Sequence, residues 1–159
     1  MDLNKLFKAQ AELDKHIVEE KGLQGQDLLK KKTVALICEL YECVNESRFF
    51  KYWSNKSMNK DNALEEYADT IHFAISIAND VGLDDYEFGD SRSLDLNDLT
   101  IGITNLATLI PERPTKNNVR TLLNLIIKLG YQLGFTEDEV IEAYHSKNKE
   151  NHIRQESGY

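Results

Sequence analysis

Residues 35–44 (ALICELYECV) and 65–78 (EEYADTIHFAISIA) place acidic residues within otherwise apolar segments. In both stretches apolar side chains recur every three or four residues, which is the period of an α-helix with one buried face. The same period predicts six helices, over about residues 2–20, 27–53, 62–81, 98–109, 115–134 and from 136 onward. No alternating strand pattern interrupts them, so the sequence predicts an all-α fold, a bundle of about six helices.

Length and composition predict one domain over residues 1–159. The chain is 41% hydrophobic and 29% charged, and a chain of this length buries roughly two-thirds of its unfolded surface without needing disulfides. Residues 83–97 (LDDYEFGDSRSLDLN) are acidic and only weakly periodic, so we expect a surface loop there. Cys38 and Cys43 fall on different sides of one predicted helix, and we expect reduced thiols in a cytoplasmic protein.

Charge and hydropathy argue against two classes of partner. The chain has 27 acidic residues against 19 basic ones, a net charge of −8, whereas a general nucleic-acid binder needs a basic face. No apolar run approaches the roughly 20 residues of a membrane-spanning helix, and the N-terminal segment is amphipathic, unlike a signal peptide. We therefore expect neither a nucleic acid nor a membrane as partner.

Two acidic pairs within the opening stretches are the most informative feature for function. Glu39 and Glu42 form E-x-x-E, and after 23 further residues Glu66 and Asp69 form E-x-x-D. Residues three apart share one face of a helix, and burying like charges is costly unless a cation compensates them. Oxygen ligands without Cys or His favour Mg²⁺, with Mn²⁺ as a substitute, over zinc. Packed antiparallel, the two helices would bring four carboxylates around one or more metal ions.

Two alternative interpretations of these acids remain open. Acidic pairs on helices commonly form a solvated face without any ligand. A di-iron bundle also uses inward-pointing glutamates, but it requires Glu-x-x-His on two helices. His72 follows Asp69 at that spacing, whereas the predicted helix over residues 27–53 contains no histidine.

Three further motifs accompany the acidic pairs. Residues 50–53 (FKYW) follow the first pair, residues 72–73 (HF) follow the second, and residues 147–159 (KNKENHIRQESGY) close the chain. With these motifs the chain, from about residue 10 to residue 159, resembles the dimeric dUTPases of the all-α nucleoside triphosphate pyrophosphatase superfamily, which includes MazG proteins. The closing stretch fits the family pattern K-x-x-x-N-x-x-R-Q-x-x-G-Y, and the compact length resembles bacterial or phage members.

The resemblance implies an activity, a cofactor and an assembly. It implies a homodimer that hydrolyses dUTP to dUMP and pyrophosphate by attack at the β-phosphorus, with dUDP as a further candidate substrate and active sites built from both chains. Glu39, Glu42, Glu66 and Asp69 would hold two or more Mg²⁺ ions. Either Glu39 or Glu42 would be the catalytic base that takes a proton from a metal-bound water.

The resemblance also implies a set of substrate-binding residues. Family members carry a Gln and an Asn on the first helix that read the uracil edge, and here Gln10 and Asp14 stand in that segment, with an acid replacing the second amide. The other candidates are aromatic, basic and polar side chains of the three motifs: Phe50, Lys51, Trp53, His72, Phe73, Lys147, Asn151, Arg154 and Tyr159. For the aromatic residues and the histidine, packing in the core is the alternative.

The closing motif predicts a clamp for the triphosphate. Lys147, Asn151 and Arg154 share one helix face if the sixth helix continues to about residue 154, and their donors suit phosphate oxygens. The alternative is a helix C-terminus whose bases suit its dipole. Residues 148–159 contain too few apolar residues to fold alone, so we predict a mobile lid that bound triphosphate orders.

Two other functions remain open from the sequence. A broader pyrophosphatase would act on dCTP or modified nucleotides, and a non-enzymatic acidic helical module would bind a protein partner. A regulatory protein partner of the enzyme also stays open.

Overall fold

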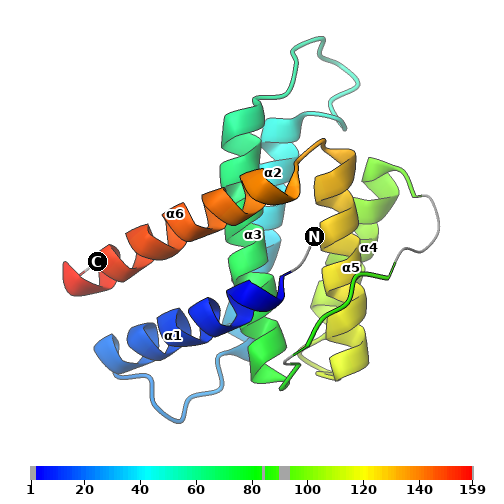
Figure 1. The fold of residues 1–159 in the computed structure, drawn as a ribbon. Coiled ribbons are helices and arrows are strands. Elements are labelled where there is room, and N and C mark those ends of the chain that lie inside the picture. The colour runs from blue at the N-terminus through cyan, green and yellow to red at the C-terminus, as the bar shows by residue number, and fades with distance from the viewer. Residues whose placement is uncertain (1–2, 84, 90–93, 159) are drawn as a thin grey trace.

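The computed structural model describes residues 3–83, 85–89 and 94–158, and within them the chain forms six helices and no strand. The helices are α1 (Asn4–Glu20), α2 (Leu29–Ser47), α3 (Lys60–Asp80), α4 (Leu96–Leu109), α5 (Lys116–Gln132) and α6 (Glu137–Glu156) (Figure 1). The predicted all-α fold is confirmed. In the described part of the chain, no helix is both long and apolar enough to cross a membrane.

Four helices begin at a side chain that caps free backbone N–H groups. Asn59, Asp95 and Thr115 each accept a hydrogen bond from a backbone N–H in the first turn of α3, α4 and α5. At the start of α6, Thr136 and Glu139 form a reciprocal capping box, for which the T-x-x-E spacing of residues 136–139 is typical. Short polar residues therefore set the beginnings of these helices.

The second helix is shorter than predicted. α2 ends at Ser47, and Arg48 follows it with a left-handed backbone, at a φ of 64°. The Arg48 guanidinium donates hydrogen bonds to Ser54 Oγ at 2.8 Å and to the Lys56 carbonyl at 3.2 Å, which hold the turn in place. The extension of this helix to residue 53 was wrong, and residues 48–59 form an irregular connection between α2 and α3.

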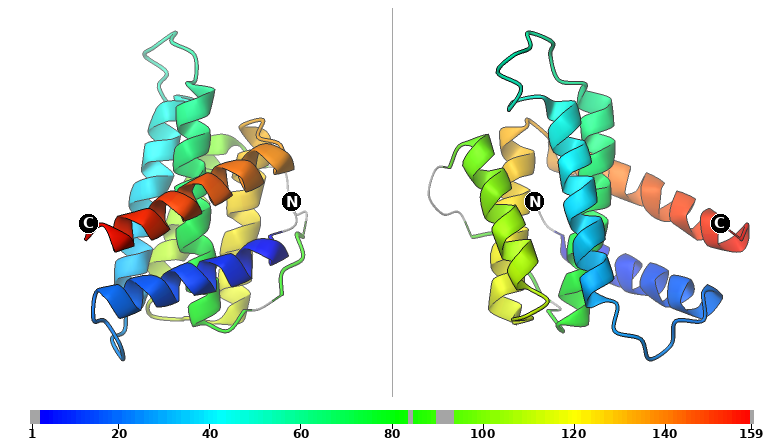
Figure 2. Two further views of the ribbon diagram at one scale, coloured as in Figure 1. Left: turned by 60° about the vertical axis from the view of Figure 1, so that its left-hand side comes forward. Right: turned by 180° about the vertical axis from the view of Figure 1, so that it is seen from behind.

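Four of the helices pack as a bundle, and the other two lie across it. α2 and α3 run antiparallel and pack against each other, while α4 and α5 form a second antiparallel pair beside them (Figure 1). α1 and α6 pack on α3 and on each other, and both cross the bundle steeply and project beyond it in the same direction (Figure 2). The predicted acidic helices are therefore neighbours, and α1 and α6 both lie close to α3.

The core lies inside the four-helix bundle and under α1 and α6. Tyr67 of α3 is fully buried and donates a hydrogen bond to the Ile126 carbonyl of α5 at 3.0 Å. A Cβ on Gly130 would overlap the Tyr67 hydroxyl, so this contact between helices requires glycine. In the connection before α4, Leu83 and Tyr86 are buried although the segment is irregular.

Candidate functional site

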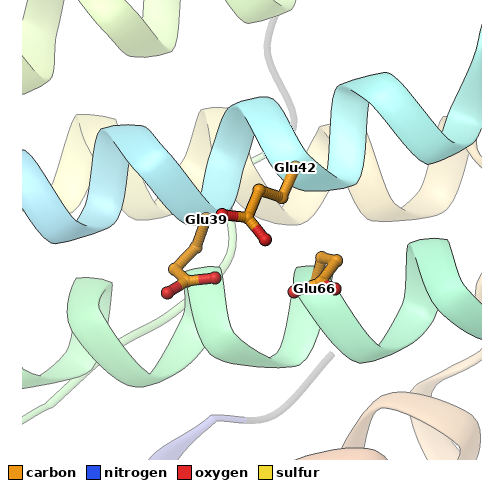
Figure 3. Close-up of side chains that lie close together, drawn as sticks. All are labelled: Glu39, Glu42 and Glu66. Carbon is orange, nitrogen blue, oxygen red and sulfur yellow. The ribbon is translucent and has the colours of Figure 1, made fainter.

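Three glutamates converge between α2 and α3. Glu39 and Glu42 come from successive turns of α2, and Glu66 comes from the facing side of α3 (Figure 3). One carboxylate oxygen from each lies within 4.8 Å of the other two. The i, i+3 spacing on α2 and the antiparallel packing of α3 produce this arrangement. The sequence predicted four carboxylates here, and the structure brings three of them within this distance.

Burial and the charges of neighbouring acids both act on the pKa values of Glu39 and Glu66. Burial, followed by the charges of Asp69, Glu42 and Glu66, raises the pKa of Glu39 from 4.5 to about 7. The pKa of Glu66 is also raised, first by burial and then by the charge of Glu42. A divalent cation would offset this repulsion, and an all-oxygen donor set fits Mg²⁺ or Mn²⁺.

Asp69, the fourth predicted ligand, faces a lysine. Its Oδ2 lies 2.9 Å from the Nζ of Lys147 on α6, and the same Nζ lies 2.9 Å from Glu65 Oε1. Burial raises the pKa of Asp69 in spite of this lysine, and the two carboxylates raise the pKa of Lys147 against the effect of burial. α6 therefore carries a positive charge to the edge of the carboxylate cluster.

The rest of the predicted phosphate clamp follows along α6. The helix continues to Glu156, so Lys147, Asn151 and Arg154 belong to one helix, as their spacing requires. Arg154 forms an ion pair with Glu150 and donates a hydrogen bond to Asn151 Oδ1 at 3.4 Å. Tyr159 lies outside the described residues.

Gln10 and His72 lie in the interior and bind each other. The Nδ1 of His72 is 2.7 Å from Gln10 Oε1, its Nε2 is 3.1 Å from the Tyr144 carbonyl, and the rings of His72 and Tyr144 stack with centroids 3.8 Å apart. Burial lowers the pKa of His72 to about 4, which favours the neutral form of the ring. Gln10 Nε2 donates to Asp14 Oδ1 at 2.8 Å. The two buried residues thus hold the carboxylate of Asp14, which is partly exposed.

A largely apolar pocket of about 270 Å³ lies beside Asp14, between α1, α2 and α3. Its lining residues include Asp14, Lys32, Ala35, Phe73 and Ser76. Ala35 precedes Glu39 by one turn of α2, and Phe73 follows Asp69 by one turn of α3, a rise of about 6 Å. The pocket therefore adjoins the carboxylate cluster along the groove between the two helices.

Two polar residues of this pocket that contact Asp14 were not predicted. Ser76 donates a hydrogen bond to Asp14 Oδ2 at 2.6 Å, and Lys32 lies 2.7 Å from Asp80 and 3.7 Å from Asp14. Ser76 follows Asp69 by seven residues, so its spacing could have placed it on the same face of α3. The Lys32 contacts join three helices, and no short-range pattern in the sequence indicates them.

The aromatic segment after α2 lies away from this pocket. Phe50 lines a separate pocket of about 200 Å³ with Tyr41 and Ile101, on the side where α2 meets α4. Trp53 is 64% exposed. Lys51 donates to Asn45 Oδ1 at 2.6 Å and lies over the Phe50 ring. Within the described part of one chain, the structure does not bring Phe50 or Trp53 into the pocket beside Asp14.

Comparison with known proteins identifies the family to which the chain belongs. A search of curated proteins found no match for the chain. The family model described as dUTPase matches residues 2–159, which is nearly the whole sequence. The chain therefore belongs to the dUTPase family, and this membership identifies it as an enzyme with dUTP diphosphatase activity.

Proposed function

We propose that the protein is a divalent-metal-dependent dUTP pyrophosphatase that converts dUTP to dUMP and pyrophosphate. The convergence of Glu39, Glu42 and Glu66, with Asp69 one turn further along α3, carries this proposal. The pKa values of Glu39, Glu66 and Asp69 are raised, first by burial, and for Glu39 and Glu66 also by the charges of the neighbouring acids of the cluster, which a bound cation would offset. When bound, Mg²⁺ would neutralise the triphosphate and acidify an attacking water.

The chain's own residues have separate roles in this mechanism. Either Glu39 or Glu42 would take the proton of the attacking water, since both belong to the carboxylate cluster. Lys147 and Arg154 stabilise the charge that grows on the phosphates, with Asn151 as a further donor. Following the family resemblance, we assign the attack to the β-phosphorus.

The pocket beside Asp14 supports a base-binding role. It adjoins the cluster, so a base in it leaves the phosphates beside the acids. The aromatic ring of Phe73 provides a surface for stacking against a base, and Asp14 and Ser76 provide polar atoms at the pocket edge for hydrogen bonds to it. A wrong base would leave these polar groups unpaired, and such mismatches discriminate by far more than one methyl group does. Gln10 and His72 act here by holding Asp14 in position.

The end of α6 supports a closing lid. Residues 148–156 form the last turns of α6, on the part of this helix that projects beyond the bundle together with α1 (Figure 2). We propose that residues 148–159 are mobile in the free protein and become ordered over bound triphosphate, excluding water from the reacting phosphorus.

A homodimer accounts for the exposed apolar side chains of the α2–α4 face. Val34, Tyr41 and Ile101 are exposed there, and Trp53 is exposed nearby in the chain. Such a face commonly marks a protein interface. We propose that a second copy covers it and that the aromatic segment of each chain serves the partner's nucleotide site. A nucleotide substrate and two free cysteines suit a cytoplasmic enzyme.

The test is release of pyrophosphate from dUTP, dCTP, dTTP and UTP, each with Mg²⁺ and with a chelator, and of phosphate from dUDP. We expect Mg²⁺-dependent turnover of dUTP, preferred over dTTP and dCTP by several orders of magnitude. Comparable kcat/KM values for dCTP and dUTP would indicate a broader pyrophosphatase. Absence of turnover, with thermal stability unchanged by Mg²⁺ and nucleotide, would contradict the proposal in favour of a binding module.

A further inference from the structure

Lys147 is the cation that the structure places at the carboxylate cluster. Its side chain is only 13% exposed, and its Nζ makes two ion pairs of 2.9 Å, with Glu65 and with Asp69. The charge of Lys147 also acts on Glu39 and Glu66, where it opposes the effects of burial and of the neighbouring acids. One lysine from α6 therefore compensates part of the negative charge of four carboxylates.

The position of Asp69 follows from this lysine. Glu66 and Asp69 are three residues apart on α3, so they share a helix face. Glu66 nevertheless brings an oxygen to the group formed with Glu39 and Glu42, whereas Asp69 directs Oδ2 to Lys147. A metal ion held by all four acids would therefore compete with the lysine for the Asp69 carboxylate.

We propose that Lys147 is an exchangeable counter-ion, which holds Asp69 in the metal-free protein and passes to a nucleotide phosphate when a divalent metal takes that carboxylate. The inference rests on the metal site proposed above and goes beyond it. Lys147 acts on the metal through Asp69, so in this first step it is a positioning residue. In the second step the ammonium group of Lys147 binds a phosphate of the nucleotide that enters together with the metal.

The chemistry of lysine suits this exchange. An ammonium is a compact charge on a flexible stem whose three donors rotate freely, unlike the planar fork of arginine. A short movement of Nζ can therefore change its partner from a carboxylate to a phosphate. Glu65, which is 55% exposed, remains beside the lysine during the exchange and keeps α6 close to α3. Metal loading and nucleotide binding are consequently coupled, because each frees the partner that the other needs.

The test is metal binding without nucleotide. Calorimetric titration of Lys147→Met with Mg²⁺ or Mn²⁺ should show affinity about fivefold to tenfold tighter than the wild type, because a partly buried competing cation is gone. Lys149→Met is the matched control: it removes the same charge from an exposed position on the same helix, and its affinity should change by less than about twofold. Unchanged or weaker metal binding by Lys147→Met would overturn the proposal.

A second variant separates the loss of the positive charge from the loss of the hydrogen bond to Asp69. Lys147→Gln keeps a hydrogen-bond donor for Asp69 but removes the positive charge, and it should also bind metal more tightly than the wild type. Circular dichroism checks that each variant is folded, and unfolding of both variants would overturn the proposal, since the ion pairs would then be structural. Failure of wild-type dUTP turnover would contradict the proposed function instead, whatever the metal affinities of these variants.

Discussion

Replacing Glu39 by Gln should stabilise the metal-free protein while abolishing most of its activity. The substitution keeps the size of the side chain and removes one charge from the cluster of Glu42, Glu66 and Asp69. The pKa of Glu39 rises from 4.5 to about 7, a difference that corresponds to about 3 kcal/mol if taken in full. Because the side chain is partly exposed, solvent screening reduces this to about 1 to 2 kcal/mol.

The size of this stability gain depends on pH. A carboxyl group whose pKa is raised by folding favours the folded state below its unfolded pKa of 4.5, and this stability is lost as pH rises through about 7. Wild-type Glu39 therefore costs stability at pH 8 and much less at pH 5. We expect Glu39→Gln to gain about 1 to 2 kcal/mol at pH 8 and only a few tenths at pH 5.

The assay is urea unfolding followed by circular dichroism, with chelator present, at pH 5 and pH 8. Glu142→Gln, which alters an exposed glutamate on α6, serves as the matched control and should change stability equally at both pH values. With Mg²⁺ and dUTP, Glu39→Gln should lose at least about a hundredfold in kcat/KM. A variant that is destabilised at pH 8, or that keeps its specific activity, would refute the reasoning and restore a structural role for this acid.

Three further predictions concern packing, acid stability and the C-terminal segment. Gly130→Ala should lower the free energy of unfolding by about 1 to 3 kcal/mol in chemical denaturation, because its Cβ would overlap the buried Tyr67 hydroxyl; wild-type stability would contradict this contact. The pKa of His72 is lowered from 6.5 to about 4, so its contribution to stability is present above pH 6.5 and lost as pH falls toward 4. His72→Gln should flatten that part of the pH–stability curve, and an unchanged slope would argue against a buried neutral histidine. Deleting residues 151–159, which removes only the last turns of α6, should leave the fold and the dimer intact but cut kcat/KM severely. Hydrogen exchange of residues 148–158 should slow when Mg²⁺ and a non-hydrolysable dUTP analogue bind; full protection without ligand would contradict the lid.

The fold could be predicted from the sequence because its signals are local. Hydrophobic periodicity located the helices, and Thr115 and Thr136 marked the starts of α5 and α6. The end of α2 was missed for a local reason as well. Apolar residues continue past Ser47 without a glycine or proline, and the left-handed turn falls on Arg48, a residue type that gives no such signal.

The site was only partly predictable, since some of its contacts span the whole chain. The i, i+3 spacing of Glu39 and Glu42, and of Glu66 with Asp69, was enough to indicate a cluster. The ion pair between Lys147 and Asp69 depends on how α6 crosses α3, which spacing along one helix cannot show.

The interior network was unpredictable for the same reason. Gln10 and His72 are 62 residues apart, and Gln10 and Tyr144 are 134 apart. The family resemblance gave His72 as a substrate-binding residue. The burial of His72 against the Tyr144 ring depends on how three helices pack together, which the sequence of one helix does not indicate.

The most direct test of the account is pyrophosphate release from dUTP as Mg²⁺ is titrated, in the wild type and in Glu66→Gln. We expect no rate in chelator and a saturable rise with Mg²⁺ in the wild type. Glu66→Gln should lose at least about a hundredfold in rate or require far more Mg²⁺, while Glu142→Gln matches the wild type. A wild-type rate that is independent of Mg²⁺, or that survives in Glu66→Gln, would contradict a catalytic metal held between α2 and α3.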